Sequence, residues 1–410
     1  MQRSAVFASF LTANLSAAFR LSSPTAALTI RSAMSMTKTP CDWDSTITRP
    51  EATIDKVVKF GGVYFSSGKL YWLEERPDEG GRSVLCEYAP DDPKKSKRNG
   101  IDVSPQGTNV RTRANEDYGG DAVVMRGNKI FYSEFTTQRL CKLSDDGTSK
   151  PIPGDKGGRY RYADGVLSYN CNVIYCVRED HKHSEKEVVK EIVSIDVRDG
   201  YTKVLARGNA SYSHPRVSSN GKKLAYITWN HPAMPLCTEL RVTDIYSAKS
   251  NESCDHKLIA GGREGDTAVI RPTYQGGRLY YISNRSGYYN IYRAGFEGSI
   301  LPMEADFGQL RQQGFLFTPG KNGRLVAQYE KDGRSVLLTA NVRDGRAPAT
   351  DIEEYSGEKD GLPMTFTGLV AGENGNFYFA GGSPGTLSSI YEWNIESKGE
   401  ATILSCSSSC

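Results

Sequence analysis

The sequence predicts an all-β protein, a seven-bladed β-propeller made of four-stranded antiparallel blades. Three observations predict this fold. Short runs of apolar and aromatic residues recur at intervals of 43 to 60 residues, clusters of Gly, Asn, Asp and Ser separate the runs, and helical patterns are nearly absent. A repeat of about 40 to 50 residues that holds four short strands is typical of a propeller blade.

The second strand of each blade has the most regular pattern. It begins with an apolar residue that aromatic residues follow closely, a composition favoured in strands. The seven strands begin at Leu70, Ile130, Val173, Leu224, Leu279, Leu325 and Phe377. Turn residues that tolerate the positive φ of a tight hairpin precede five of them, at 67–69, 127–129, 220–222, 276–278 and 322–324.

Third and fourth strands complete each blade. The third strands are expected at 83–88, 139–143, 191–197, 239–245, 290–295, 335–342 and 389–395. An outer, fourth strand follows in several blades, for example at 203–205 after an Asp-Gly turn. Because a single blade cannot bury both of its faces, the blades are expected to stack around a common axis.

The propeller is expected to span residues 57–404, after an N-terminal extension at 39–56 and before a tail at 405–410. The last blade has its own outer strand at 401–404 and needs no strand from the N-terminal part. We therefore expect the ring to close by packing of the last blade against the first, and not by an interlocked blade that both ends share.

The first 38 residues form a leader with a composition of its own. Ala, Ser, Thr and Leu dominate it, basic residues are spaced along it, and no acidic residue occurs before Asp42. Such a composition is typical of an organellar transit peptide and predicts a mitochondrial or plastid location. If translation starts at Met34 or Met36 instead, or if the leader is a disordered extension, the cytoplasm is the predicted location.

Composition argues against nucleic-acid and membrane partners. The formal net charge is +3, but the leader alone contributes +4 and the remainder is −1. The longest basic run, 94–98, contains no aromatic residue that could stack on a base. No segment approaches the roughly 20 apolar residues that span a bilayer. The nine cysteines have no regular spacing, which favours reduced thiols and predicts neither a metal site nor a cofactor.

Several stretches, taken together, resemble the propeller of the prolyl oligopeptidase family of serine peptidases, in particular its acylaminoacyl-peptidase and dipeptidyl-peptidase-like members. They occur in matching order across about residues 42–404. They are WDSTIT (43–48), FGGVYF (60–65), YWLEERP (71–77) with EGGR (79–82), VRTR (110–113), RYADG (161–165), VREDH (177–181) and WNHP (229–232). The stretch NEDYGGD (115–121) departs from the His-Glu-Tyr-Gly-Gly-Gly-like segment of relatives, and no role is carried over from it.

The resemblance implies a partner and a function. In the family, a C-terminal α/β-hydrolase domain on the same chain carries a Ser-Asp-His triad, and the propeller restricts access of peptides to it. The leading hypothesis is therefore a substrate-gating and docking propeller whose catalytic domain is absent from these 410 residues. The alternatives are a free-standing interaction scaffold, an inactive peptidase homologue, and a metal-centred propeller hydrolase with Asp, Asn and Glu around the axis.

One match to the serine nucleophile motif Gly-x-Ser-x-Gly occurs at 381–385. A working motif needs a strand, a sharp turn and a helix around the serine, and a histidine later in the chain. Only 27 residues follow Ser383, they have strand patterns, and the last histidine is His256. We therefore expect no catalytic residue in this chain, and we place Ser383 in the loop between the second and third strands of blade 7.

Polar residues end most of the second strands, and equivalent loops of all blades lie on one face of a propeller. The predicted site is this rim, which could recognise peptide ends or hold a partner domain. Water alone also explains polar strand ends, so the alternative is a solvated surface. The rim residues with an expected role are Glu75, Arg76, Arg178, Glu179, Asp180, His181, Asn230, His231, Asn284 and Arg285.

Overall fold

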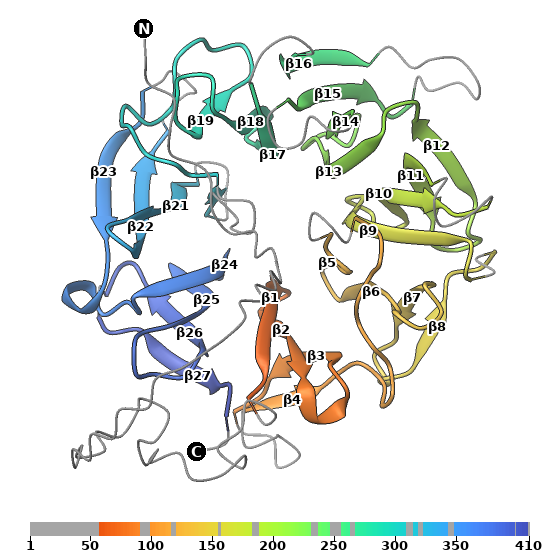
Figure 1. Cartoon of the computed structure of the whole chain (residues 1–410), viewed down its shortest axis with the longest axis horizontal. Coiled ribbons are helices and arrows are strands. Elements are labelled where there is room, and N and C mark those ends of the chain that lie inside the picture. Colours follow the sequence, from red (N-terminus) through yellow and green to blue (C-terminus); the bar gives the residue numbers. More distant parts are fainter. Residues whose placement is uncertain are drawn as a thin grey trace, which may run out of the picture. The chain divides into compact units, whose positions relative to one another are not determined.

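The computed structural model of the chain shows seven small antiparallel sheets arranged in a ring, the predicted seven-bladed propeller (Figure 1). The leader and the extension lie outside the residues that the structure describes. Those residues are 57–90, 99–115, 120–154, 157–182, 188–230, 237–246, 256–262, 267–308, 315–318, 323–342, 348–397 and 399–408.

Blades 1 to 3 each contain four consecutive strands. Blade 1 consists of β1 (Lys59–Ser66), β2 (Lys69–Arg76), β3 (Arg82–Tyr88) and β4 (Gly100–Asp102). Blade 2 consists of β5 (Val123–Arg126), β6 (Lys129–Ser133), β7 (Leu140–Leu143) and β8 (Ser149–Pro151). Blade 3 consists of β9 (Tyr160–Leu167), β10 (Val173–Asp180), β11 (Val189–Asp196) and β12 (Thr202–Ala206).

Blades 4 to 7 complete the ring. Blade 4 consists of β13 (Ser211–Val217), β14 (Lys223–Trp229), β15 (Glu239–Asp244) and β16 (Lys257–Gly261), and blade 5 of β17 (Val269–Gln275), β18 (Arg278–Ser283) and β19 (Asn290–Arg293). Blade 6 consists of β20 (Phe315–Phe317), β21 (Leu325–Lys331), β22 (Arg334–Asn341) and β23 (Thr350–Tyr355). Blade 7 consists of β24 (Thr365–Ala371), β25 (Asn376–Gly382), β26 (Ser389–Asn394) and β27 (Thr402–Cys406).

The predicted second and third strands are all confirmed, and the structure differs from the expectation in two places. Blade 5 has three strands among the described residues, and a single bridge between Tyr292 and Ser299 stands where a fourth would pair. Strand β27 continues to Cys406, past the expected end at 404, because Ser389 still pairs with Cys406.

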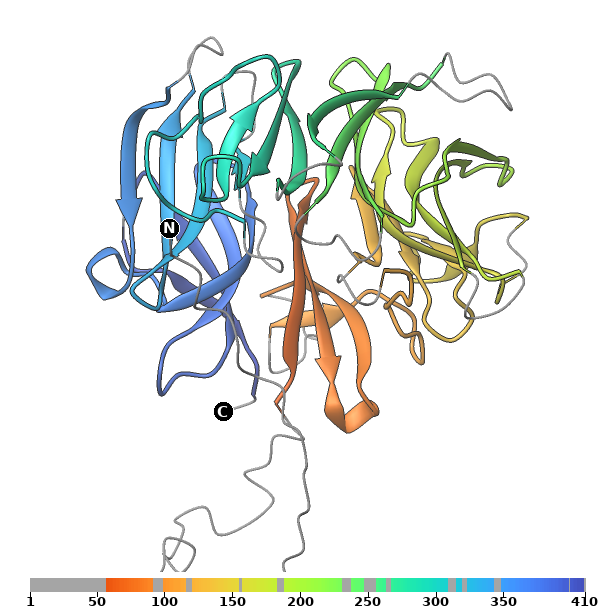
Figure 2. The same ribbon diagram turned by 45° about the horizontal axis from the view of Figure 1, so that its top comes forward.

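Two short 3-10 helices, η4 (Pro77–Glu79) and η6 (Glu358–Asp360), are the helical segments of the described chain. Figure 2 shows the strands of blade 1 (orange) running between the two faces of the ring, with the β2–β3 hairpin that contains η4 at one face. Across the described residues, no helix has the length and apolarity that crossing a membrane requires.

Seven hydrophobic clusters hold the ring together, one between each pair of neighbouring blades. The cluster that closes the ring joins Val63 and Trp72 of blade 1 to Ile390 and Leu404 of blade 7. Burying one large apolar side chain in this way contributes about 1.5–3 kcal/mol. The expectation that the ring closes by packing is confirmed, since each sheet contains only consecutive strands.

The innermost strands of five blades carry a β-bulge at an equivalent place. A bulge inserts one residue, bends the strand and redirects a side chain. In blades 4 and 5 the second bulge residue is a proline, which cannot donate to the neighbouring strand and therefore fits a bulge. The first bulge residues are Gly61, Asp164, His214, Arg271 and Gly368.

Three of these bulge residues are charged or titratable and still adopt a left-handed backbone. Their φ angles are 56° at Asp164, 49° at His214 and 51° at Arg271. For a residue with a Cβ atom this conformation costs roughly 1–2 kcal/mol, a cost that glycine avoids. Strain of this kind tends to occur where side chains have a function.

Candidate functional site

Side chains from the inner parts of blades 1 to 5 converge on one another. We name the group the axial cluster; it consists of Tyr64, Asp121, Asp164, His214, Arg216 and Arg271. Five of these residues lie on inner strands: Tyr64 on β1, Asp164 on β9, His214 and Arg216 on β13, and Arg271 on β17. Asp121 lies just before β5. Each inner strand is held by its own blade, so the bulges fix where these side chains point.

A chain of hydrogen bonds links blades 1 to 4 through this cluster. The hydroxyl of Tyr64 donates to Oδ1 of Asp121 at 2.7 Å. The amide of Asp121 donates to Oδ1 of Asp164 at 2.9 Å, and the amide of Asp164 donates back to the carbonyl oxygen of Asp121 at 2.9 Å. The amide of His214 lies 3.4 Å from Oδ2 of Asp164. Both carboxylates therefore have partners in the protein.

Burial controls the electrostatics of the acidic half. It raises the pKa of Asp121, and the neighbouring Asp164 carboxylate raises it further. Asp121 remains accessible to water, but it lies between blades 1 and 3, where the surrounding protein disfavours charge. Burial and the Asp121 carboxylate together raise the pKa of Tyr64, so its hydroxyl remains a donor.

The basic half comes from blades 4 and 5. Burial lowers the pKa of His214 to about 4, and the charges of Arg271 and Arg216 oppose its protonation. Burial, followed by the Arg216 charge, lowers the pKa of Arg271 to about 10. Burial also lowers the pKa of Arg216. At neutral pH the cluster thus holds two guanidinium groups near a neutral imidazole.

The rim residues of blade 3 are used mainly to hold the protein together. The Glu179 carboxylate is buried and contacts Nε2 of His181, Nζ of Lys190 and the amide of Asn115, each at 3.1 Å. Asn115 donates through Nδ2 to the carbonyl oxygen of Tyr212 at 2.9 Å. Glu179 therefore holds Asn115 in place, and through Asn115 it connects blade 3 to Tyr212 of blade 4.

Two other rim residues of blade 3 form ion pairs. Arg178 donates to Oε2 of Glu191 at 2.5 Å and stacks over the ring of Tyr160. Asp180 accepts two hydrogen bonds from Arg159, at 2.9 and 2.7 Å, and these bonds hold the pKa of Asp180 below its ordinary value.

The ion pair between Arg159 and Asp180 and the buried Glu179 are expected to contribute different amounts to stability. The Arg159 side chain is 46% exposed, so replacing Asp180 with Asn should lower the free energy of unfolding by less than about 1 kcal/mol. Replacing the buried Glu179 with Gln should lower it by more, about 1–3 kcal/mol. Denaturant unfolding of both variants measures the difference, and equal losses would contradict the structural role of Glu179.

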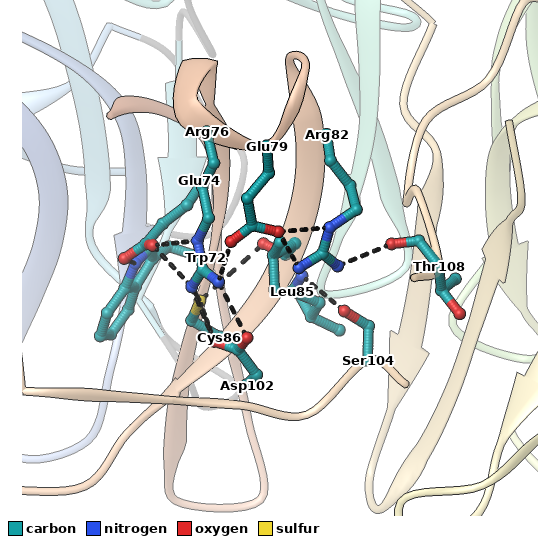
Figure 3. Close-up of polar contacts among 11 residues, drawn as sticks. Trp72, Glu74, Arg76, Glu79, Arg82, Leu85, Cys86, Asp102, Ser104 and Thr108 are labelled. Carbon is teal, nitrogen blue, oxygen red and sulfur yellow. Dashed lines mark hydrogen bonds and ion pairs between the residues drawn. The ribbon is translucent and has the colours of Figure 1, made fainter. Parts of the chain in front are cut away.

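In blade 1 the rim residue Arg76 lies at the centre of a polar network (Figure 3). Its guanidinium group donates to Oε2 of the fully buried Glu74 at 3.0 Å and to both oxygens of Asp102, at 2.8 and 2.6 Å. Burial alone would raise the pKa of Asp102, but Arg76 holds it below the ordinary value. The neighbouring Glu75 is half-buried and pairs with Lys59 in the β1–β2 ladder.

The remaining rim residues order loops in their own blades. Oδ1 of Asn230 accepts a hydrogen bond from the amide of Ala210 at 3.0 Å, and Oδ1 of Asn284 accepts one from the amide of Ala268 at 2.7 Å. Arg285 stacks over the ring of Tyr292, 3.9 Å from its centroid. His231 lies outside the described residues. A recognition role for the rim stays a prediction.

Ser383 lies where the sequence places it, in the loop between β25 and β26. Its Oγ accepts a hydrogen bond from the amide of Met364 at 2.9 Å, and its amide donates to Oγ1 of Thr386 at 2.8 Å. Strand β26 follows the loop, whereas a nucleophile motif requires a helix there. The local structure is a hairpin turn.

Among the residues that the structure describes, the cysteines form no disulfide and no group of side chains forms a metal site. Cys86, Cys141 and Cys176 are buried there and, like the other described cysteines, are not in disulfides. Burial raises the pKa of Cys176 to about 12, so this thiol stays protonated. Within those same residues, no three His, Cys, Asp or Glu side chains lie close enough together to hold a metal ion.

Sequence reasoning missed the axial cluster. Two signals pointed to it: His214-Pro215 and Arg271-Pro272 interrupt strand patterns, and each places a proline directly after a titratable residue. A proline inside an inner strand is a sign of a bulge, and a bulge redirects the residue beside it. The contact between Asp121 and Tyr64 depends on how blade 2 packs against blade 1, which the sequence pattern of either blade does not show.

Known structures resemble this chain, although no protein-family model matches the sequence and the search of curated proteins found no match. A puromycin-hydrolyzing peptidase from Mycobacterium tuberculosis is 23% identical, with a TM-score of 0.69, over 86% of this chain and 54% of that chain. Prolyl oligopeptidase B from Galerina marginata is 13% identical, with a TM-score of 0.58, over 85% of this chain and 51% of that chain. The chain shares its fold with these peptidases.

The likeness to prolyl oligopeptidase-type enzymes is thus confirmed at the level of the fold. The chain spans about half the length of the peptidases it matches. An oligogalacturonate lyase in complex with manganese is also similar, at 11% identity and a TM-score of 0.51, over 82% of this chain and 86% of that chain. Identities this low establish a common architecture and leave the reaction to be argued separately.

Proposed function

We propose that the chain is the substrate-gating and docking propeller of a prolyl oligopeptidase-type serine peptidase. Peptide hydrolysis would take place in an α/β-hydrolase domain that works with the propeller. The propeller would admit short peptides and keep folded proteins away from the catalytic serine. By itself the propeller is expected to be inactive.

The observation that carries the proposal is the extent of the structural match. It takes in 86% of this chain but only 54% of the mycobacterial peptidase, so the likeness is to one large part of that enzyme. Sequence stretches that resemble the family lie on the inner two strands of blade 3: RYADG (161–165) is on β9, and VREDH (177–181) is on β10 except for His181, which directly follows it.

The polar side chains of the described residues fit a binding role better than they fit the catalytic triad of a serine peptidase. Serine-peptidase catalysis needs a nucleophile, a histidine within hydrogen-bond reach of it, and an acid that orients the histidine. The one serine in a nucleophile-like motif, Ser383, uses its Oγ to accept a backbone hydrogen bond. The described histidines 181, 214 and 256 make their hydrogen bonds in blades 3 and 4, whereas Ser383 belongs to blade 7.

Two measurements test the proposal. The purified 410-residue chain should not hydrolyse chromogenic acyl-peptide, X-Pro or X-Ala substrates. The native protein, captured from its source cells with an antibody against the propeller, should react with a fluorophosphonate probe. Mass spectrometry should find the labelled serine on the polypeptide that contains the propeller peptides or on a domain bound to it. Inhibitor-sensitive turnover by the chain alone, or an unlabelled native protein, would contradict the proposal.

A second candidate is a free-standing interaction scaffold. Closure of the ring by the cluster around Trp72 and Leu404 favours it, because that closure uses only the blades themselves. The fluorophosphonate experiment separates the two candidates: a scaffold stays unlabelled in the native state, and a peptidase propeller is captured together with a reactive serine.

A further inference from the structure

The interface between blade 7 and blade 1 is filled along one part and open along another. Toward the β24–β25 turn it is filled, because Val370 and Tyr378 pack against the apolar cluster and the rings of Tyr378 and Phe65 stack 5.4 Å apart. Toward the rim, the wall that blade 7 contributes has only short side chains, and a cleft of about 520 Å³ remains, with Phe60 of blade 1 on its other wall. The short residues form two neighbouring pairs of β24 and β25: Thr365 with Gly382, and Thr367 with Ala380.

Gly382 is a glycine that neither the backbone nor the packing requires. It ends β25 without a left-handed backbone, and a Cβ atom added to it would lie 3.7 Å from its nearest neighbour, the Cα atom of Ser388, which is an ordinary contact. At the adjacent Gly381, by contrast, a Cβ atom would lie 2.6 Å from the carbonyl oxygen of Thr365. A strand glycine without such a reason often marks a place that a ligand approaches closely. The missing side chain at position 382 leaves the cleft open.

The cleft offers hydroxyl groups and apolar surface. Among the described residues, those that line it are all uncharged. The side chains of Thr367 and Ser388 are exposed, and their hydroxyls make no hydrogen bond to another described residue. Oγ of Ser383 accepts a hydrogen bond from the amide of Met364, and its own proton is left to donate. Phe60 supplies an aromatic ring. A charged group entering the cleft would lose water without gaining a counter-charge.

We propose that this cleft binds an uncharged stretch of an extended peptide. Each peptide residue presents one N–H donor and one C=O acceptor, and a hydroxyl group can serve either. The hydroxyls of Thr367, Ser383 and Ser388 would bind these groups, and a side chain of the peptide would pack against Phe60. The volume of about 520 Å³ lies in the range of ligand pockets, roughly 300–1,000 Å³. That the ligand is a peptide rests on the proposed function; that it is uncharged rests on the lining residues.

Methyl NMR tests the site locally, because Met364 lines the cleft. Its ¹³C-methyl resonance is assigned by its loss in Met364→Leu. Titrating the 410-residue chain with acetyl-Ala-Leu-Ala-amide should shift this resonance saturably and leave that of Met125, in blade 2, in place. A central Glu or Lys in the peptide should each weaken binding by roughly tenfold or more, since the charge would be desolvated without a partner. Equal affinity for the charged peptides, or an unshifted Met364 resonance, would overturn the assignment.

Variants of the wall locate the ligand. Gly382→Val fills the cleft with a residue that strands favour, so thermal unfolding should be native while peptide binding weakens by roughly tenfold or more. Thr367→Val removes one hydroxyl at nearly constant volume and should weaken binding by about two- to tenfold. The matched control is Gly262→Val, at another glycine with room for a side chain, and it should bind like the natural chain. Natural affinity in both cleft variants, with native unfolding, would place the peptide elsewhere and overturn the site.

Two further outcomes are decisive. A neutral disaccharide such as maltose that shifts the Met364 resonance at lower concentrations than the peptide would show a sugar site and overturn the peptide assignment. A native protein that reacts with fluorophosphonate, together with a Met364 resonance that no peptide shifts, would remove this inference and leave the proposed function in place. Saturable peptide binding by a protein that stays unlabelled in its native state would contradict the proposed function and keep the cleft as a peptide site.

Discussion

Replacing Arg76 with Met is expected to lower the free energy of unfolding by about 3–5 kcal/mol, because the substitution removes the positive charge that the buried Glu74 carboxylate binds. The Glu74 side chain is 1% exposed and the Arg76 side chain 8%. Arg76 also binds Asp102, which is 43% exposed and can be hydrated once the arginine is gone. The loss therefore arises at Glu74.

The matched control is the exposed pair formed by Lys69 and Glu87 in the same sheet. Its atoms are 2.7 Å apart, but Lys69 is 57% exposed, and Lys69→Met should cost at most about 1 kcal/mol. The double variant Glu74→Leu/Arg76→Met removes both buried charges and should recover much of the loss. Urea unfolding followed by tryptophan fluorescence measures all of these variants, since Trp72 donates to Oε1 of Glu74 at 3.0 Å. A loss no larger than that of Lys69→Met would show that Glu74 is not held by Arg76.

This expectation limits how the rim can be tested. Arg76 was predicted as a gating residue because it ends a second strand, yet its contacts mainly maintain blade 1. A loss of activity in an Arg76 variant of a full-length enzyme would therefore report unfolding as readily as gating. A variant of Arg159, whose side chain is 46% exposed, suits a gating test better.

The blades were predictable because their pattern is local. Aromatic second strands, glycine turns and third strands follow from residues that are close in sequence. In the structure, the expected hairpin at Gly276 and Gly277 has φ angles of 55° and 78° at these glycines. Closure by packing was also predictable, since the last blade supplies its own outer strand, β27.

The functional side chains were less predictable because they depend on contacts between blades. Periodicity shows that Glu74 ends a strand, but it does not show that the side chain is covered there and bonded to Trp72 and Arg76. Likewise, Glu179 looks like a rim residue in sequence, but it is buried in the structure and accepts a hydrogen bond from the amide of Asn115, in a distant segment. Polar strand ends therefore predict position on a face and not exposure.

The bulges of the inner strands also show that the position of a side chain depends on contacts that the local sequence pattern does not contain. Residues 213–216 read Ser-His-Pro-Arg, which breaks the alternation expected of a strand. The structure keeps the strand by inserting a bulge between Ser213 and Arg216. Placing His214 near Asp164 and Arg271 then depends on the neighbouring blades, which sequence patterns do not relate to one another.

The propeller is expected to lose about 3 kcal/mol of stability through His214 alone as the pH falls from 6.5 to 4. In the unfolded chain the imidazole has its ordinary pKa near 6.5, whereas burial and two arginines lower the pKa to about 4 in the folded protein. Between these values the unfolded state binds one proton more, so stability rises with pH across this window. The contribution is complete above pH 6.5 and is lost as the pH falls to 4.

Substituting His214 with Asn should remove this dependence and keep the bulge, because Asn tolerates a left-handed backbone. The groups that act on His214 are Asp164 on β9, Arg216 on the same strand and Arg271 on β17, and they remain in the variant. Urea unfolding from pH 4 to 7 should give a flatter curve for the variant than for the natural protein, by about 3 kcal/mol over the window. The difference between the two curves isolates the histidine from carboxylates that titrate nearby, among them Asp121. Substituting His256, which lies outside the axial cluster, should leave that difference in place, and parallel curves for the His214 variant and the natural protein would show that the imidazole is not held neutral by the ring.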